Sequence, residues 1–355
     1  MRVVQLIDSL DVGGGERMAV NLANLFGAKE VPNLLFATRK GGGLQTLLKN
    51  QSNVVVLSKS GTLDVFTFLR LLRSIKSFRP SVIHAHDSSI FWAVAIKLLT
   101  PGILLVWHAH YGGFSSQDAR FGKKIKYLQR FIDRVIVVNS HLLNWVHAEL
   151  SGIPKAAYIG NFPDRISEAK FDREHLKWII SVANLKTPKN HQGLVLAFSR
   201  FNKKKPGYKL ALIGTKEDPQ YLQEVETLIA SESLTEEVKL VGSTVDLKPW
   251  FDKARMGVLS SHIEGLPVSL LELGLSGVPV ISSEVGACGS LLEGGHCGYL
   301  VAPGSVDQLT SAMASLVDHP QETKSKAILF EQKVRDEFGG NKFFKAYKTL
   351  IKLKE

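Results

Sequence analysis

Two series of short apolar runs, rich in β-branched residues and separated by longer amphipathic stretches, follow one another along this chain. Such alternation is typical of a parallel sheet with helices on both faces, because parallel strands need a crossover connection between them. The first series predicts strands at residues 3–7, 34–37, 54–57, 82–84, 103–107, 135–138 and 156–159. The second predicts strands at 178–182, 209–213, 238–241, 257–259 and 278–281. The expected fold is α/β, with two doubly wound parallel sheets.

A chain of 355 residues is longer than one hydrophobic core usually supports, which again favours two domains. Proline and rising polarity mark the boundary near residues 161–164. We therefore expect one Rossmann-like domain at residues 1–164 and a second at 165–339. A helix at about 340–355 is expected to pack back on the first domain.

The composition is that of a soluble globular protein, with 45% hydrophobic residues and a mean hydropathy of +0.04. No run reaches 18 apolar residues, and Asp8 interrupts the first apolar run, which favours a strand over a signal peptide. Cys288 and Cys297 are the only cysteines, too few for a disulfide framework or a metal cluster. A cytoplasmic protein is expected.

Positive charge is concentrated in the first half of the chain. Residues 1–164 hold 19 Lys and Arg against 10 Asp and Glu, so +9 of the net +11 lies there. One helical stripe would carry Arg70, Arg73, Lys76 and Arg79, opposite Phe68, Leu71, Leu72 and Ile75. A second basic group follows at Arg120, Lys123, Lys124, Lys126 and Arg130. The stripe is either a solvated face or a surface for anionic lipid or a lipid-phosphate acceptor. No nucleic-acid motif or stacking aromatic accompanies it, so nucleic acid is not expected as a partner.

Two carboxylates, Glu264 and Glu272, are separated by seven residues around a predicted helix start. Pro267 suits the first helical position, which makes Glu264 a loop residue and Glu272 a helical one. Free N–H groups at such a helix end can hold an anion. A nucleoside diphosphate-sugar fits this layout, with its phosphate at the helix end, ribose hydroxyls at Glu272 and sugar hydroxyls at Glu264. The candidate contacts are Glu264, Gly265, Leu266, Pro267, Val268 and Glu272. The alternative is a pair of ordinary surface acids.

Other candidate residues lie in loops that follow predicted strands, where open α/β sheets bind ligands. Gly13 and Gly14 permit close backbone approach to an anion, although the spacing is not that of a nucleoside triphosphate or dinucleotide loop. His108 and His110 could each bond a sugar hydroxyl as neutral imidazoles. His84 and His86 are interpreted as mainly structural, since no Cys or carboxylate pattern completes a metal site around the histidines. The second half of the chain adds Asn184, Lys189, Gly214 and Val245.

Together these segments resemble the retaining glycosyltransferases of family four (group 1), which have a GT-B fold of two Rossmann-like domains facing a central cleft. The resemblance runs from residue 1 to about 352, and the stretch from Glu264 to Glu272 with its flanks is its most specific part. It implies a UDP- or GDP-linked donor sugar, a glycan or lipid-linked acceptor on the N-terminal domain, and polysaccharide or glycoconjugate synthesis. It also implies that no cofactor and no metal ion are needed.

The resemblance assigns catalytic roles to His110, Lys189 and Glu264. His110 aligns with a histidine against the donor sugar, and Lys189 with the lysine that neutralises the diphosphate. The chain departs from the family where Asn184 replaces an arginine, so donor affinity would rest more on Lys189 and Lys186. Retention at the anomeric carbon is implied, by a front-face route or by double displacement.

Two other functions stay open on the same fold. One is an epimerase or phosphorylase, and the other is a non-catalytic sugar-nucleotide-binding subunit, which the missing arginine favours. Peripheral contact with the inner face of an anionic membrane is a further hypothesis. The sequence leaves the donor sugar, the acceptor, the linkage and the oligomeric state open.

Overall fold

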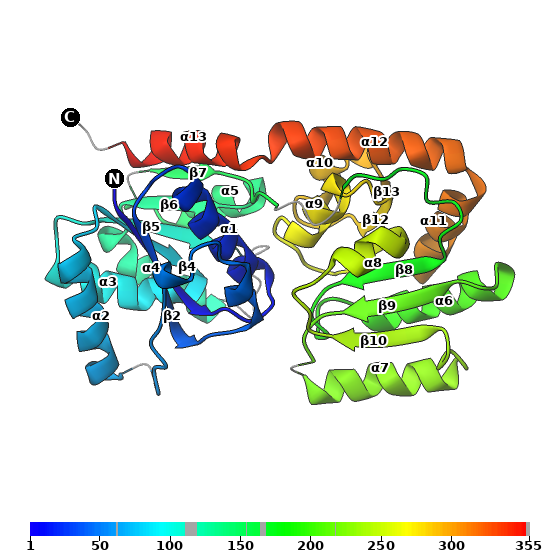
Figure 1. Cartoon of the computed structure of the whole chain (residues 1–355), viewed down its shortest axis with the longest axis horizontal. Helices are drawn as coiled ribbons and strands as arrows, with labels where there is room; N and C mark the ends of the chain where they lie inside the picture. Colours follow the sequence, from blue (N-terminus) through cyan, green and yellow to red (C-terminus); the bar gives the residue numbers. More distant parts are fainter. Residues whose placement is uncertain (62, 111–118, 154, 164–167, 217, 353–355) are drawn as a thin grey trace. The chain divides into compact units, whose positions relative to one another are not determined.

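The computed structural model describes residues 1–355 except 62, 111–118, 154, 164–167, 217 and 353–355, and except the side chains of 119 and 120. The chain divides into two compact units, Met1–Phe162 with Gly340–Glu355, and Pro163–Gly339. Each unit is built on one parallel sheet with helices packed against it, which confirms the predicted doubly wound α/β fold (Figure 1). Within the described residues no helix is both long and apolar enough to cross a bilayer.

The first unit holds a seven-stranded sheet in the order β3-β2-β1-β4-β5-β6-β7. Its strands are β1 (Val3–Ser9), β2 (Asn33–Lys40), β3 (Val54–Val56), β4 (Val82–His86), β5 (Leu104–Ala109), β6 (Arg134–Val137) and β7 (Ala156–Tyr158). Its helices are α1 (Gly14–Ala28), α2 (Val65–Phe78), α3 (Ile90–Leu99), α4 (Ala119–Leu128), α5 (Ser140–Glu149) and α13 (Gly340–Ile351). Short 3₁₀ turns lie at η1 (Gly43–Leu47), η2 (Gln51–Asn53), η3 (Asp87–Ser89) and η4 (Gln129–Phe131).

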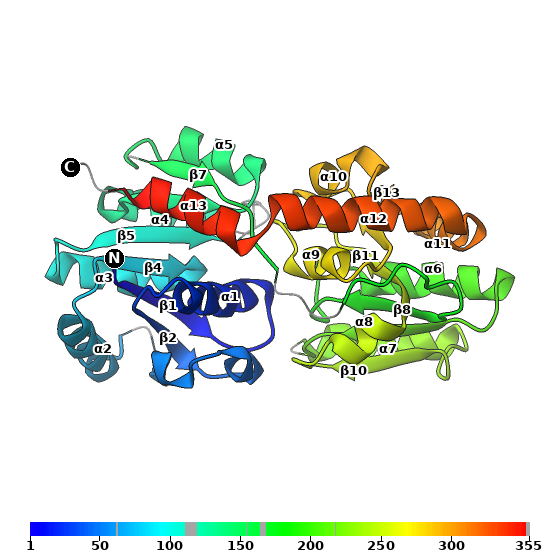
Figure 2. The same cartoon turned by 45° about the horizontal axis from the view of Figure 1, so that its top comes forward.

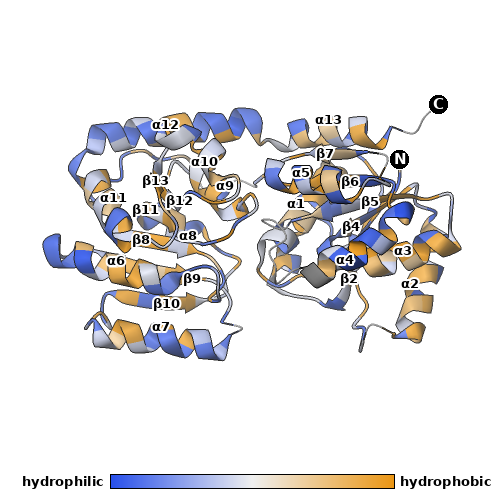
Figure 3. Cartoon of the chain, turned by 180° about the vertical axis from the view of Figure 1, so that it is seen from behind, coloured by the Kyte–Doolittle hydropathy of each residue, from blue (hydrophilic) through white to orange (hydrophobic). Residues whose placement is uncertain are grey.

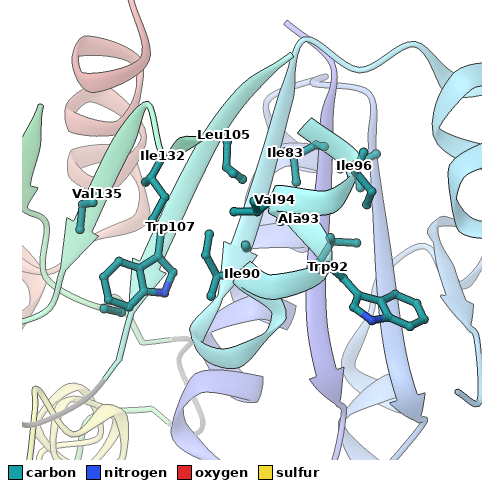
Figure 4. Close-up of a cluster of buried hydrophobic side chains, with 14 of the residues drawn as sticks. Ile83, Ile90, Trp92, Ala93, Val94, Ile96, Leu105, Trp107, Ile132 and Val135 are labelled. Atoms are coloured by element: carbon teal, nitrogen blue, oxygen red, sulfur yellow. The ribbon is translucent and has the colours of Figure 1, made fainter. Parts of the chain in front are cut away.

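Alternation of side chains along the strands gives this sheet two buried faces. Ile83 of β4 and Trp107 of β5 pack against α3 on one face, in the apolar cluster of Figure 4. The neighbouring positions of β4, His84 and His86, point to the opposite face and are also buried. Burial on both faces explains why the strands read as nearly continuous apolar runs.

Helix α13 covers part of this second face (Figure 2). Phe343 and Tyr347 are buried there with Phe26 of α1, and the hydroxyl of Tyr347 lies 3.3 Å from Nδ1 of His84. Arg134 of β6 donates a hydrogen bond to the carbonyl of Leu350 (2.8 Å). Helix α13 is thus part of the core of the first unit.

The second unit holds a six-stranded sheet in the order β10-β9-β8-β11-β12-β13. Its strands are β8 (Trp178–Val182), β9 (Lys209–Ile213), β10 (Val238–Gly242), β11 (Ala254–Leu259), β12 (Val280–Ser283) and β13 (Tyr299–Val301). Its helices are α6 (His191–Lys204), α7 (Pro219–Ser231), α8 (Lys248–Lys253), α9 (Val268–Leu275), α10 (Cys288–Leu291), α11 (Val306–Asp318) and α12 (Pro320–Glu337), with a 3₁₀ turn η5 (Glu293–Gly295).

Strand β13 was not among the predicted strands. It has three residues, follows Gly298 directly and lies at the edge of the sheet beside β12. So short a run carries too little apolar periodicity to be separated from a loop. It forms a strand because the folded chain places it beside β12.

Candidate functional site

The first sheet reverses its strand order between β1 and β4, and ligands bind beyond the carboxyl ends of strands at such a point. The loop after β1 begins helix α1 there, as predicted. Gly13 is the N-cap residue in extended conformation, and the exposed Gly14 is the first helical residue. A Cβ on Gly14 would meet no atom within 4 Å, so the surface in front of this turn is open.

The structure brings this glycine loop against His110. A Cβ added to Gly15 would lie 3.2 Å from Oδ2 of Asp87 and 3.5 Å from the His110 ring. Only a residue without a side chain allows so close an approach without crowding. Residues that follow three different strands, β1, β4 and β5, therefore meet at one place.

Asp87 belongs to this group, and the sequence analysis did not single it out. Its backbone has a positive φ of 44°, a conformation in which aspartate and asparagine are enriched among the residues other than glycine. Oδ1 accepts a hydrogen bond from the backbone N–H of His110 (2.8 Å). The pKa of Asp87 is raised to about 7, mainly because the carboxyl is buried. The hydrogen bond from His110 acts to lower this pKa, and the negative charges of Glu16 and Asp8 act to raise it. Asp87 directly follows β4, the strand beside β1, and this position after a strand could have marked it as a candidate ligand-binding residue.

The two candidate histidines lie in different surroundings. His108 is inside β5 and completely buried, whereas His110 follows the strand and is half-buried. The prediction that both lie in a loop is wrong for His108, because β5 continues two residues beyond Trp107. Residue 111, which follows His110 in the sequence, lies outside the described residues. Only His110 faces the glycine loop.

Buried hydrogen bonds join the histidines of β4 and β5. Nε2 of His84 lies 3.1 Å from Nδ1 of His108, and Nδ1 of His86 lies 2.9 Å from Nε2 of His110. Among the described residues, His84, His86 and His108 also bring ring nitrogens within 4.8 Å of one another, a spacing that a metal ion could use. Burial is the first cause that holds the pKa of each of the four histidines well below 6.5, so all are neutral at pH 7.

Gln5 and Asn161 extend this network at its two ends. Oε1 of Gln5 lies 3.0 Å from Nε2 of His86, and the donor and acceptor of each contact depend on the tautomers of the rings. A side-chain hydrogen bond with Asn161 acts to raise the pKa of His110, against the larger effect of burial.

The cations near this place are engaged by Asp8. Its carboxylate lies 2.8 Å from Nζ of the buried Lys59 and 3.4 Å from Nε of Arg39. Burial acts to raise the pKa of Asp8, but hydrogen bonds from Lys59, Ser88 and Thr38 outweigh it and lower the pKa to about 2. Asp8 is therefore ionised at pH 7.

The second sheet reverses its order between β8 and β11, and the predicted donor residues meet at that point. Nζ of Lys189, in the loop after β8, lies 2.7 Å from Oε1 of Glu264, in the loop after β11. Ser261 donates to the same carboxylate oxygen (2.6 Å), and Ser260 donates to the carbonyl of Lys189 (3.0 Å). The pair is largely buried, with 21% of the lysine side chain and 8% of the glutamate side chain exposed.

Helix α9 begins one residue later than predicted. Pro267 is the N-cap residue in extended conformation, and Val268 is the first helical residue. Extended geometry at Pro267 still leaves the first N–H groups of the helix without a helical partner. Glu272 lies within the helix and is only 2% exposed, so it is not the surface acid of the alternative interpretation.

Two glycines let the loops of this unit approach each other. A Cβ on Gly286, which has φ +55°, would lie 2.1 Å from the carbonyl oxygen of Glu264. A Cβ on Gly214 would lie 2.1 Å from the carbonyl oxygen of Ala183, beside Asn184. The Asn184 side chain accepts from the N–H of Thr215 (3.3 Å), so it holds the loop after β9.

The loop after β10 is adjacent to this group, since the N–H of Gly214 donates to the carbonyl of Gly242 (3.0 Å). Val245, further along that loop, is half-buried. Strand β10 is separated from β8 by β9. Val245 is therefore the candidate that the sheet order places furthest from the Lys189–Glu264 pair.

Comparison with known proteins places the chain in a family. The family model for glycosyl transferases group 1 matches residues 164–332, and that for glycosyltransferase family 4 matches residues 12–164. An uncharacterized glycosyltransferase of Haemophilus influenzae is 22% identical over 96% of each chain. An α-1,4-N-acetyl-D-galactosaminyltransferase of Campylobacter jejuni, which acts on an undecaprenol-linked saccharide, is 26% identical over 85% of this chain and 84% of its own.

Solved structures share the fold. Anabaena HepE, solved with UDP and glucose, superimposes with a TM-score of 0.82 at 18% identity, over 99% of this chain and all of HepE. Staphylococcus aureus TarM superimposes with a TM-score of 0.81 at 12% identity, over 99% of both chains. With two Rossmann-like sheets and matches to both family models, the chain belongs to the family 4 (group 1) glycosyltransferases of the GT-B fold.

Proposed function

We propose that this glycosyltransferase moves a sugar from a UDP- or GDP-linked donor to a glycan or lipid-linked acceptor, with retention at the anomeric carbon. The observation that carries the proposal is the contact between Lys189 and Glu264 at the switch point of the second sheet. Crystals of HepE contain UDP-glucose, and the Campylobacter relative is named for an undecaprenol-linked acceptor. Both support this choice of donor and acceptor classes.

The pair suits the charges that develop during transfer. Cleavage of the bond between sugar and diphosphate leaves negative charge on the departing phosphate, and a lysine stabilises it. In the structure Lys189 pairs with Glu264. A bound diphosphate would compete for the ammonium group and free the carboxylate to accept hydrogen bonds from sugar hydroxyls. Glu264 would thus hold the sugar, and the departing phosphate could take the acceptor proton on the same face.

The ribose contact of the proposal is Glu272, and the phosphate contact is the start of α9. A rise of about 1.5 Å per residue puts Glu272 roughly 6 Å along the helix from Val268. That separation suits a ribose attached to a diphosphate at the helix end. The side chain is buried against its own unit, which would hold it in one orientation for the two ribose hydroxyls.

The direct test is turnover with a panel of nucleotide sugars and lipid-linked acceptors, with and without EDTA. We expect one UDP- or GDP-sugar to raise the melting temperature and to yield an α-linked or β-linked product of unchanged anomeric configuration, at the same rate in EDTA. Product of inverted configuration would refute retention. Loss of activity in EDTA that a divalent ion restores would refute metal independence.

The same panel separates the alternative functions. A donor that stabilises the protein but is never consumed would indicate a binding subunit, the reading that Asn184 in place of arginine favours. Conversion of donor without acceptor would indicate an epimerase, and release of sugar phosphate with inorganic phosphate would indicate a phosphorylase.

We further propose that helix α2 contacts an anionic membrane surface that carries the acceptor. The four cations of its stripe are exposed, and Leu71, Leu72 and Ile75 are buried, as the periodicity predicts. The structure adds an apolar edge at the start of the helix, where Leu63 is 90% and Phe66 84% exposed, with Val65 and Leu69 beside them. Orange residues mark much of α2 in Figure 3. Exposed apolar side chains next to cations match an anionic lipid interface.

Replacing Arg70, Arg73, Lys76 and Arg79 with glutamine should abolish sedimentation with anionic vesicles at low salt. Each cation near such a surface contributes about 1 kcal/mol, an attraction that salt screens. Phe66→Ser should weaken binding at every salt concentration, because it removes apolar contact. Nucleotide binding should be unchanged in both variants, and zwitterionic vesicles give the background. Equal sedimentation of the quadruple variant and the wild type would show that the stripe is an ordinary solvated face.

A further inference from the structure

The group around Asp87 differs chemically from the Lys189–Glu264 pair. Its carboxyl lies against the glycine loop, with a Cβ of Gly15 only 3.2 Å from Oδ2. Oδ1 is occupied by the N–H of His110, whereas no residue of the described chain donates to Oδ2. Asp87 holds this carboxyl with a positive φ of 44°, directly after β4.

The groups that act on the Asp87 carboxyl are acidic or neutral. Besides burial, Glu16 of α1 and Asp8 of β1 raise its pKa, and His110 and His86 are neutral. Lys59 and Arg39 are paired with Asp8. A neutral hydroxyl can therefore approach Asp87 without the like-charge repulsion that an anion would meet at this carboxylate.

The second carboxylate oxygen of Asp87 defines the ligand. Oδ1 accepts from the N–H of His110, and no hydrogen bond from a described residue to Oδ2 accompanies it. Carboxylate oxygens that are removed from water are normally hydrogen-bonded in the functional state of a protein. An O–H group on a neutral molecule supplies the donor that Oδ2 needs.

We propose that Asp87 is a substrate-binding residue that accepts a hydrogen bond from a sugar hydroxyl at the switch point of the first sheet, with the neutral ring of His110 beside it. This inference rests on the proposed glycosyl transfer. The hydroxyl belongs either to the acceptor or to the sugar of the donor, and the two sources share the same chemistry.

The test compares Asp87→Asn with the wild type, using the donor and acceptor that the nucleotide-sugar panel identifies. The amide keeps an oxygen for the N–H of His110 but cannot offer an ionised oxygen to a hydroxyl. The KM of one substrate should rise about 10- to 100-fold, as expected when a hydrogen bond to a charged group is lost. A higher acceptor KM assigns the hydroxyl to the acceptor. A higher donor KM, with unchanged affinity for the free nucleoside diphosphate, assigns it to the donor sugar.

The pH dependence separates binding from a structural role. Wild-type kcat/KM for that substrate should fall as the pH drops below about 7, because the carboxylate takes up a proton. Asp87→Asn should lack this limb. The raised pKa means that the stability contributed by the protonated carboxyl is present below pH 3.8 and is lost as the pH rises through about 7. At pH 8 the Asn variant should therefore melt no lower than the wild type.

Two further variants keep the proposal falsifiable. Gly15→Ala puts a methyl group 3.2 Å from Oδ2 and should raise the same KM. Asp133→Asn is the matched control, since that carboxylate also accepts from a backbone N–H, of Leu105 (2.7 Å), but at the amino end of β6. It should lower stability and leave both KM values unchanged.

The outcomes are distinct. Wild-type transfer with unchanged KM values and an unchanged acid limb in Asp87→Asn overturns this inference and leaves the proposed function standing. Absence of transfer by the wild type with every donor overturns both proposals.

Discussion

Lys189→Ala should lower kcat for glycosyl transfer by about 10²- to 10³-fold, the loss typical of removing one group that stabilises charge in a transition state. The ammonium group lies at the switch point of the second sheet, where the loops after β8 and β11 meet. In the proposed reaction it meets the charge of the leaving diphosphate. Alanine removes that charge and leaves the nucleoside contacts in place.

Binding measurements distinguish this role from a folding defect. Calorimetry with UDP and uridine, or with GDP and guanosine, should show that the nucleoside diphosphate loses much more affinity than the nucleoside. Lys203→Ala is the control, since Lys203 is an exposed lysine of the same unit that pairs with Glu232. Equal losses for both members of a ligand pair would mean that Lys189 acts through the fold.

The ion pair makes a second variant informative. Glu264→Gln removes the internal competitor for Lys189 while keeping a side chain of similar shape. It should bind the free nucleoside diphosphate at least as tightly as the wild type and yet transfer sugar far more slowly. Weaker diphosphate binding in this variant would contradict the competition inferred from the 2.7 Å contact.

Arg173→Met should lower the free energy of unfolding of the second unit by about 3–5 kcal/mol, a typical cost of leaving buried polar groups unpaired. The guanidinium is 1% exposed and donates to five backbone carbonyls within 3.1 Å. These carbonyls belong to Lys170, Phe251, Ala254, Ser276 and Gly277. One side chain thereby joins the segment before β8 to the ends of α8 and α9. Burial lowers the pKa of Arg173 to about 10, so it stays charged at pH 7.

Urea unfolding followed by tryptophan fluorescence measures the effect, since Trp178 and Trp250 lie in the second unit. Lysine at position 173 should not restore stability, because one ammonium group cannot replace a fork with five hydrogen bonds. Arg200→Ala removes an arginine from an exposed pair with Asp307 and should change stability by less than about 1 kcal/mol. A loss in Arg173→Met no greater than in Arg200→Ala would show that the five bonds are offset by desolvation.

Much of the fold followed from local pattern. Apolar runs of the right length predicted every strand except β13, because strands buried on both faces must be apolar throughout. Residues whose signal is local were also found, such as the glycines at the start of α1 and the glutamates that flank the start of α9. Errors arose where a boundary depends on packing. The helix began at Val268 and not at Pro267, and β5 continued through His108.

By itself the sequence determined which residues could form strands, helices and anion-binding turns. The spacing of apolar residues and the backbone preferences of glycine and proline, which carry this information, involve only a few neighbouring residues. Only the tertiary structure decided which of them meet. Lys189 and Glu264 are 75 residues apart and touch because β8 and β11 are neighbours in the sheet. Asp87 reaches the glycine loop because β4 lies beside β1, and Arg173 reaches carbonyls of two distant segments, at the ends of α8 and α9. These contacts depend on strand order and on loop closure over long stretches of chain, which no short window of sequence contains.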